Sequence, residues 1–385
     1  MKIKIAVLFG GKSTEHEVSI ISAIQALNSF DKEKYELLPI YISKDGDFYY
    51  NDKEKFLDVN NFKDTKKLLS ESTLIYFVKE NNKVYIKEET NHLFKKGYIN
   101  DIDIFFPIVH GTNVEDGVLQ GFLQMYNIPC VGSSVLSSAV GMDKYIMKKF
   151  LMQEGIPVLD GDKFNINDYK DEENLIERIE KKYSYPVIIK PINLGSSIGI
   201  SISKDKNTLK SALSLAFSFS EEIVVEKAIV NLREINCAVL GDKYNCIPSM
   251  CEEAKKKGDI LSFENKYIKD DSTKQNTNSR KAQIDDGTRE YIEKISMDTF
   301  KAIGCAGVAR VDCMIDVDSG KIYVNEINTI PGSLSFYLFE GSGIKYQELL
   351  DRLIKIALDN FRRREKINFT FGNNLLSNHK LFKNK

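Results

Sequence analysis

The sequence lacks a strong excess of charge of either sign. Its 54 Lys and Arg residues nearly balance 55 Asp and Glu residues, which leaves a formal net charge of -1 over 385 residues. Proteins that attract nucleic acid or anionic lipid over a broad surface carry a clear basic excess. We therefore expect neither nucleic acid nor a membrane surface among the partners of this chain.

Long apolar runs and histidine are also scarce. No apolar run reaches the roughly 18 residues that span a bilayer, and the first residues form a short strand-like run rather than a signal peptide. Four histidines argue against a zinc cluster. Six cysteines lie mostly inside apolar runs, as reduced thiols do. The sequence thus predicts a soluble cytoplasmic protein.

The chain does contain enough apolar material for several packed layers, and its length favours two or three domains. Residues 4–9 are strand formers and end at Gly10-Gly11. Thr14 and Glu17 have the spacing of a capping box, which predicts a helix starting there. Strand, glycine turn and helix are typical of the start of a parallel α/β domain.

The expected elements divide the chain into four segments. These are an N-terminal α/β domain at 1–132, a central domain at 133–226, a C-terminal domain at 227–365 and a polar tail at 366–385. We expect, among others, one helix at 142–154 and one strand at 260–263. The polar stretch 45–100 predicts little structure.

Two neighbouring strands near the C-terminus carry the sharpest chemical signal. Arg310 and Asp312 are two residues apart and share one strand face, as do Glu326 and Asn328 on the next strand. A turn at 318–320 places Asp312 opposite Glu326. Two carboxylates buried together require a cation, and Mg²⁺ suits a few hard oxygen ligands with room for phosphate. The alternative is a surface salt-bridge patch.

A glycine loop follows the predicted strand that ends at Lys190. Gly195, Ser196 and Ser197 allow backbone N–H groups to close around phosphate oxygens. The alternative is an ordinary structural turn. The loop is not a Walker loop, because no Gly-Lys-Ser/Thr follows, and Gly10-Gly11 lacks the spacing of a dinucleotide site.

Glu15 and His110 follow two strands of the predicted N-terminal sheet. The carboxyl ends of such strands are where open α/β sheets place ligands. Glu15 is suited to an ammonium group and His110 to a carboxylate. The alternative for Glu15 is a simple partner of the helix dipole.

These motifs occur together, in this order, in a known family. The chain resembles the D-alanine–D-alanine ligases through collinear matches that run from residue 4 to about 360. The matching segments are 10–19, 110–111 with 115–121, 142–144, 190–191 with 195–199, 225–227, 233–234, 266–267, 310–312, and 325–329 with 331–332. The resemblance implies an α/β (mixed α+β), three-domain ATP-grasp fold with an N-terminal parallel-sheet domain.

The resemblance also implies a role for each site residue. The ATP-binding residues would be Lys144, Lys190, Ser197, Glu226, Lys227 and Glu234. Two Mg²⁺ ions, replaceable by Mn²⁺, would bind Asp312, Glu326 and Asn328. The catalytic residues would be Arg310 and the network of Glu15, Ser196 and Tyr267, and the substrate-binding residues His110, Lys266, Gly332 and Tyr337. The expected substrates are D-alanine and ATP, and the expected assembly is a homodimer.

The implied chemistry has two half-reactions. ATP converts the first D-alanine to an acyl phosphate, and the amine of the second D-alanine then attacks it. Arg310 and the backbone near Gly332 would stabilise the oxyanion. The polar stretch 269–280 would close as a lid that excludes water.

Two departures from the family pattern bear on the substrate. Asn113 and Val114 precede the Glu-Asp-Gly motif where the family has glycine, and Tyr337 stands where the family has a serine that binds the second substrate. The region 45–100 is similar to the vancomycin-resistance ligases, which make D-alanyl-D-lactate or D-alanyl-D-serine. The sequence therefore favours a D-alanine–D-alanine ligase for peptidoglycan synthesis. A ligase with a different second substrate, and a non-enzymatic ATP-binding relative, are the alternatives.

Overall fold

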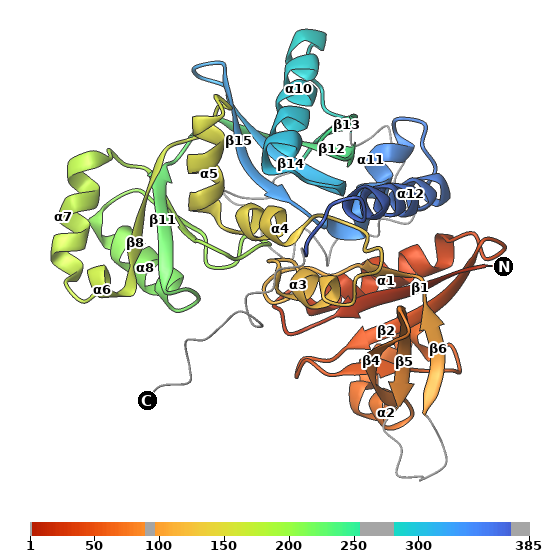
Figure 1. The fold of residues 1–385 in the computed structure, drawn as a ribbon. Helices are drawn as coiled ribbons and strands as arrows, with labels where there is room; N and C mark the ends of the chain where they lie inside the picture. The colour runs from red at the N-terminus through yellow and green to blue at the C-terminus, as the bar shows by residue number, and fades with distance from the viewer. Residues whose placement is uncertain (1, 89–96, 255–280, 371–385) are drawn as a thin grey trace, which may run out of the picture.

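The first sheet is parallel at one end. The computed structural model describes residues 2–88, 97–254 and 281–370, which form three β-sheets with flanking helices (Figure 1). Strand β1 (Ile3–Gly10) pairs in parallel with β2 (Tyr35–Ile42) and β7 (Ile104–Pro107). Residues 5–9 are fully buried, as in a parallel strand covered on both faces. Helix α1 (His16–Ser29) follows β1, which confirms the expected strand, turn and helix.

Four antiparallel strands extend this sheet beyond β2, so the expected parallel arrangement is confirmed for three strands only. The full order is β6-β5-β4-β3-β2-β1-β7. The extension occupies the polar stretch 45–100, where the sequence predicted little. It contains β3 (Phe48–Tyr50), η1 (Lys55–Leu57), η2 (Val59–Asp64), α2 (Thr65–Ser70), β4 (Thr73–Glu80), β5 (Lys83–Glu88) and β6 (Tyr98–Ile102).

The second sheet forms a unit with its own apolar core. Its strands pair antiparallel in the order β10-β9-β11-β8. Helix α7 buries one apolar stripe, Leu175, Ile176 and Ile179, and exposes its charged face, as a surface helix does. The unit contains β8 (Gly161–Asn165), α6 (Ile166–Tyr169), α7 (Glu172–Lys182), β9 (Val187–Pro191), β10 (Ser201–Ser203), α8 (Lys206–Phe217) and β11 (Glu222–Lys227). The glycine loop lies between β9 and β10.

The third sheet is antiparallel in the order β13-β12-β14-β15. Helices α5 and α10 pack on it and share its core (Figure 1). The unit contains α4 (Val135–Met142), α5 (Lys144–Gln153), β12 (Leu232–Gly241), β13 (Cys246–Glu253), α10 (Asp286–Ile303), β14 (Gly307–Asp316) and β15 (Lys321–Asn328). All six cysteines are free thiols, as expected, and four of them are buried.

The end of the described chain returns to the first sheet. Helix α12 (Tyr346–Arg364) lies beside α1 and contributes Leu349, Leu350 and Leu353 to the core that β1 begins (Figure 1). This packing brings the loops after β1 and β7 next to the loop after β15. The remaining elements are α3 (Val118–Gln124), η4 (Gly332–Ser335) and α11 (Phe336–Glu340).

Two local predictions were wrong. Thr14 does not cap α1, because the N-cap is Glu15 and no side chain caps the helix there. The expected single helix at 142–154 is two helices, because Asp143 is extended and its carboxylate accepts hydrogen bonds from the N–H groups of Tyr145 and Ile146 at the start of α5. The strand expected at 260–263 lies outside the described residues. Among the described helices, none combines the length and the apolar character needed to cross a membrane.

Candidate active site

The hairpin of β14 and β15 contains the predicted pair, beyond a register shift between Asp312 and Cys313. Asp312 lies opposite Glu326, and Arg310 lies opposite Asn328. The Arg310 guanidinium donates two hydrogen bonds to the Asp312 carboxylate, at 2.6 and 2.7 Å, and the Asn328 amide donates a third at 3.2 Å. This bidentate geometry fixes both side chains, because the planar guanidinium matches the carboxylate. The predicted polar cluster is therefore present on one strand face.

The donor chemistry of this cluster fits Mg²⁺. Asp312, Glu326 and Asn328 offer two carboxylates and one amide oxygen, which are hard ligands, and Mg²⁺ needs few protein contacts. A cluster of three or more His, Cys, Asp or Glu side chains poised to hold a metal is not found in the described part of the chain. The predicted metal-binding set contains only two such side chains, Asp312 and Glu326. The proposed site therefore also needs the amide oxygen of Asn328 and space for further oxygen ligands.

Glu15 is held by the glycine loop of the second unit. The Ser196 hydroxyl donates a hydrogen bond to one Glu15 carboxylate oxygen. Gly195 approaches the other oxygen so closely that an added Cβ would lie 2.7 Å from it. Only glycine allows this approach, which explains its place in the loop. Glu15 and Ser196 are both buried, so the expected pairing of a strand-end carboxylate with this loop is present.

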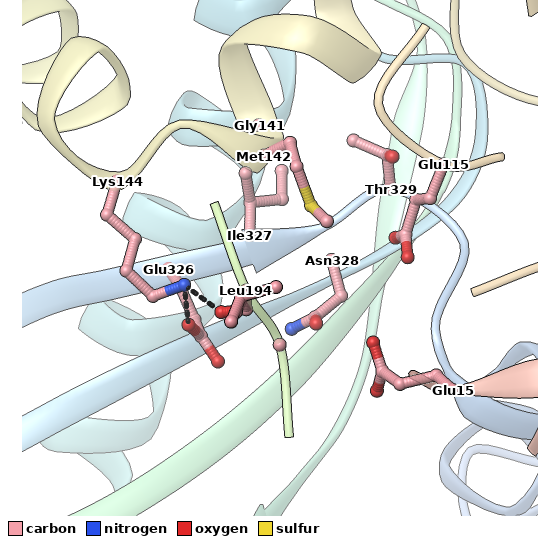
Figure 2. A pocket seen from close by; sticks show the side chains of 11 residues that line it. Glu15, Glu115, Gly141, Met142, Lys144, Leu194, Glu326, Ile327, Asn328 and Thr329 are labelled. Atoms are coloured by element: carbon pink, nitrogen blue, oxygen red, sulfur yellow. Dashed lines mark hydrogen bonds and ion pairs between the residues drawn. The ribbon is translucent and has the colours of Figure 1, made fainter. Parts of the chain in front are cut away.

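An open pocket lies between the glycine loop and the hairpin (Figure 2). Its polar lining includes Glu15, Glu115, Lys144, Glu326 and Asn328. The Lys144 ammonium donates to the Leu194 carbonyl at 2.5 Å and lies 3.6 Å from the Glu326 carboxylate. The residues that line the pocket thus come from all three units of the fold, although they lie far apart in the sequence.

A fully buried cluster of charges adjoins this pocket. Glu226 is 0% exposed, and its carboxylate accepts hydrogen bonds from Lys148 on one oxygen and from Lys190, at 2.8 Å, on the other. Lys190 also donates to the Asn325 side chain at 3.0 Å. Burial alone would raise the pKa of Glu226, but the two lysines outweigh it and lower the pKa to about 2. Burial lowers the pKa of Lys148 to about 8.

Sequence reasoning did not identify Lys148. A lysine on a predicted helix is normally solvent-exposed, and nothing local marks this one as buried. The available signal was its spacing, because Lys148 lies four residues after Lys144 and therefore on the same helix face.

His110 is a neutral, fully engaged histidine. One ring nitrogen, Nδ1, lies 2.9 Å from the Ile330 carbonyl, and the other, Nε2, lies 2.9 Å from the Ser22 hydroxyl. Burial lowers the pKa of His110 to about 4, with a smaller contribution from Arg310. Binding a substrate carboxylate through His110 would require one of these two bonds to break.

Glu115 is a second residue that sequence reasoning left without a role. Its carboxylate accepts hydrogen bonds from the N–H groups of Gly111 and Ile330, both at 3.0 Å. Burial, and secondarily the charge of Glu15, raise the pKa of Glu115 to about 8. Figure 2 shows the two carboxylates on the same side of the pocket.

The other predicted residues are placed as follows. Lys227 donates to the carbonyls of Ser184 and Tyr185 at 2.7 and 3.0 Å, and Glu234 is half-buried on β12. Ser197 has left-handed backbone dihedrals in the glycine loop. Gly332 begins η4, and Tyr337 lies half-buried in α11 against Phe336. Lys266, Tyr267 and the expected lid 269–280 lie outside the described residues.

Two sequence models match most of the chain. The family model described as "D-ala D-ala ligase N-terminus" matches residues 4–133, and the one described as "D-ala D-ala ligase C-terminus" matches residues 150–355. The chain belongs to the D-alanine–D-alanine ligase family.

Individual relatives are similar to this chain over nearly its whole length. The D-alanine–D-alanine ligase of Thermosipho melanesiensis is 41% identical over 364 residues, which cover 94% of this chain and 96% of the relative. The solved VanG D-Ala:D-Ser ligase of Enterococcus faecalis is 32% identical with a TM-score of 0.75, over 93% of this chain and all of the other. The D-alanine–D-alanine ligase of Bacillus anthracis, solved in complex with ATP, is 27% identical with a TM-score of 0.65, over 94% and 99% of the two chains.

Proposed function

We propose that this family member is an ATP-dependent, ADP-forming D-alanine–D-alanine ligase that makes a dipeptide for peptidoglycan synthesis. The observation that carries the proposal is the pocket that joins Glu15, held by Ser196, to Glu326 and Asn328 of the hairpin, beside the Arg310–Asp312 pair. A ligase needs a carboxylate for the substrate ammonium group and, nearby, cations for a transferring phosphoryl group.

The first substrate would bind beside Glu15. Its ammonium group would pair with the Glu15 carboxylate, which the Ser196 hydroxyl holds in one orientation. The family resemblance also implies that Tyr267 belongs to this network and that Lys266 binds the second substrate, and we propose both roles here. Because both nitrogens of His110 are engaged, we assign that residue to orienting the Ile330 carbonyl rather than to direct contact with the substrate carboxylate.

ATP would lie between the second and third sheets. Lys144 and Lys190 would meet its phosphates, Ser197 would contact them from the glycine loop, and Glu226, Lys227 and Glu234 would hold the adenine and ribose. The solved family member in complex with ATP supports this use of nucleotide. Both Lys148 and Lys190 contact Glu226, so Lys148 would keep the buried Glu226 paired if Lys190 turned to a phosphate.

Asp312, Glu326 and Asn328 would hold two Mg²⁺ ions, or Mn²⁺ in their place. Bound there, the metal would neutralise phosphoryl charge during transfer. Arg310 would then donate to the oxyanion of the tetrahedral intermediate, together with the backbone near Gly332. In the structure Arg310 donates to Asp312. Metal binding by Asp312 would therefore free Arg310 to donate to the oxyanion.

A ligase with another second substrate is the alternative that Tyr337 favours. A phenol in place of a serine hydroxyl reshapes the pocket for the acceptor, and the similarity to VanG D-Ala:D-Ser ligase supports keeping this alternative. A non-enzymatic relative is disfavoured, because the described residues include Arg310 and the proposed metal ligands Asp312, Glu326 and Asn328, and a retired active site usually loses a metal ligand.

We also propose the domain boundaries 1–132, 133–226 and 227–365 with a tail at 366–385, a homodimer, and a cytoplasmic location. The packing of α12 against the first sheet means that the first and third domains share one core. Sedimentation of the purified protein tests the homodimer.

A product assay tests the function. Purified protein, ATP and Mg²⁺ are incubated with D-alanine alone, and then with D-alanine plus D-serine or D-lactate. Release of ADP is measured and products are identified by mass. D-alanyl-D-alanine from D-alanine alone is the expected result. ADP release only with a second compound would identify the alternative ligase, and no ADP release with any of them would refute the enzymatic proposal.

A further inference from the structure

One residue after β15, Ile330, is held through both of its backbone polar groups. The N–H group of Ile330 donates to the Glu115 carboxylate at 3.0 Å, and the carbonyl of Ile330 accepts from His110 Nδ1 at 2.9 Å. Glu115 and His110 both follow β7 and are both buried. The loop after β7 therefore grips the chain two residues beyond the last proposed metal ligand, Asn328.

Ser22 on α1 extends this grip. Because His110 Nδ1 donates to a carbonyl, Nε2 carries no proton and accepts from the Ser22 hydroxyl at 2.9 Å. The same hydroxyl oxygen accepts from the Ser333 N–H group at 2.9 Å. Ser22 is fully buried, so both bonds are shielded from water. One hydroxyl thus links the histidine to the turn that contains Gly332.

That turn needs external support. Ser333, Leu334 and Ser335 have φ values of 51°, 52° and 50°, which lie in the left-handed region. Non-glycine residues adopt this region at a cost, and a run of three persists only when its surroundings hold it. Leu334 is 2% exposed and anchors the turn in the core, while Ser22 and Glu115 hold its backbone.

We propose that Ser22 and Glu115 are positioning residues that hold the Ile330–Ser335 turn so that the second substrate, rather than water, captures the acyl phosphate. This inference rests on the proposed function, in which the backbone near Gly332 contacts the oxyanion and α11 lies at the acceptor pocket. In capture, the amine nitrogen bonds to the acyl carbon and loses a proton, while phosphate leaves with the electrons of the broken C–O bond. With a displaced turn, water attacks the same carbon and returns D-alanine and phosphate.

The chain offers a matched control for Ser22. Ser19 lies one turn earlier on α1 and is equally buried. It accepts from the Gly10 N–H group at 2.7 Å and donates to the Ile108 carbonyl at 2.6 Å. Ser19→Ala therefore removes the same number of buried hydrogen bonds from the same helix without touching the turn.

The test compares ADP with dipeptide, measured together in the full-length protein. For Ser22→Ala we expect dipeptide formation to slow about tenfold or more while ADP release continues, because small displacements cost this much. The ratio of ADP to dipeptide therefore rises above one. Ser19→Ala is expected to keep the ratio of the unmodified protein, whatever its stability, because loss of folded protein lowers both products together.

Glu115→Gln serves as the second variant, since it keeps the size of the side chain and replaces one acceptor oxygen with a donor. We expect it to raise the ratio as well. An unchanged ratio in either folded variant, or an equal rise in Ser19→Ala, would overturn the proposal. If the unmodified protein makes no dipeptide, the proposed function fails instead, which is a separate result.

Discussion

The buried cluster of Lys148, Lys190 and Glu226 leads to a prediction about stability. The change of interest is Glu226→Gln, compared with Lys148→Met. Glu226→Gln removes the only carboxylate that the described structure places between these two lysines. Lys148→Met removes one lysine and leaves the other paired with Glu226 at 2.8 Å. We expect the first variant to be much the less stable of the two.

The magnitudes follow from the pKa values. The pKa of Glu226 falls from its ordinary 4.5 to about 2. At about 1.36 kcal/mol per pKa unit this is about 3 kcal/mol in favour of the charged form, fully present above pH 4.5 and lost as the pH falls towards 2. The pKa of Lys148 falls from 10.5 to about 8, so its buried charge costs about 3 kcal/mol that methionine avoids.

We therefore expect Glu226→Gln to lower the free energy of unfolding by about 3–5 kcal/mol, the usual cost of an uncompensated buried charge. Lys148→Met should cost less than about 2 kcal/mol by the same reasoning. The double variant should be more stable than Glu226→Gln alone, because it removes one of the uncompensated charges.

Urea unfolding at pH 7 measures all three variants, with the KM for ATP recorded in parallel. The reasoning is refuted if Lys148→Met costs as much as Glu226→Gln, or if the double variant is the least stable. A surface substitution on the same helix, Met152→Ala, is the control, since that side chain is exposed and should change little.

Three further outcomes are expected. Arg310→Met should lower kcat at least about 100-fold, because it removes an oxyanion donor. Arg310→Lys should recover little activity, because lysine cannot pair bidentately. A kcat within tenfold of the unmodified protein, measured at saturating D-alanine, would contradict this. Because the pKa of His110 is lowered to about 4, the ring stays neutral in the folded protein while the unfolded chain takes up a proton. Stability is therefore full above pH 6.5 and falls by about 3 kcal/mol as the pH falls towards 4. Urea unfolding of His110→Gln should lack this pH dependence, and an unchanged slope would disprove the assignment. If the Tyr337 phenol donates to the substrate carboxylate, Tyr337→Phe should raise the KM for the second D-alanine about tenfold and leave the KM for ATP unchanged. The same KM for D-alanine in the variant and the unmodified protein would exclude that contact.

The sequence predicted the chemistry of the hairpin because strands obey a simple period. Residues two apart share a face, so the grouping of Arg310 with Asp312 and of Glu326 with Asn328 followed from counting. The pairing of Asp312 with Glu326 was also predicted, but it depends on a register shift between Asp312 and Cys313 that the sequence did not indicate. The same reasoning located Glu15 after β1, since a glycine pair ends the strand. Such local rules need no knowledge of the rest of the fold.

Burial could not be predicted in this way. Lys148 and Glu115 look like ordinary surface residues in the sequence, and only the packing of distant elements buries them. The four-stranded extension was missed for a related reason. Its strands have one face towards solvent and carry many polar residues, so they resemble a loop until β2 supplies an edge to pair with. The capping box failed because Glu15 itself occupies the N-cap position.

The pairing of charges has a consequence for how ligands bind. Each cation proposed to meet the ATP phosphates or the oxyanion already faces an acid: Arg310 faces Asp312, Lys144 faces Glu326, and Lys190 faces Glu226. Buried ion pairs of this kind cost desolvation to form and more to break singly. Ligand binding therefore exchanges partners rather than creating new pairs, and its net gain is smaller than the number of contacts suggests. Two of the acids, Asp312 and Glu326, are the proposed metal ligands, so metal binding would release the very cations that the phosphate and the oxyanion require. On this argument metal and nucleotide should bind with positive cooperativity, because each removes the partner that would otherwise compete with the other.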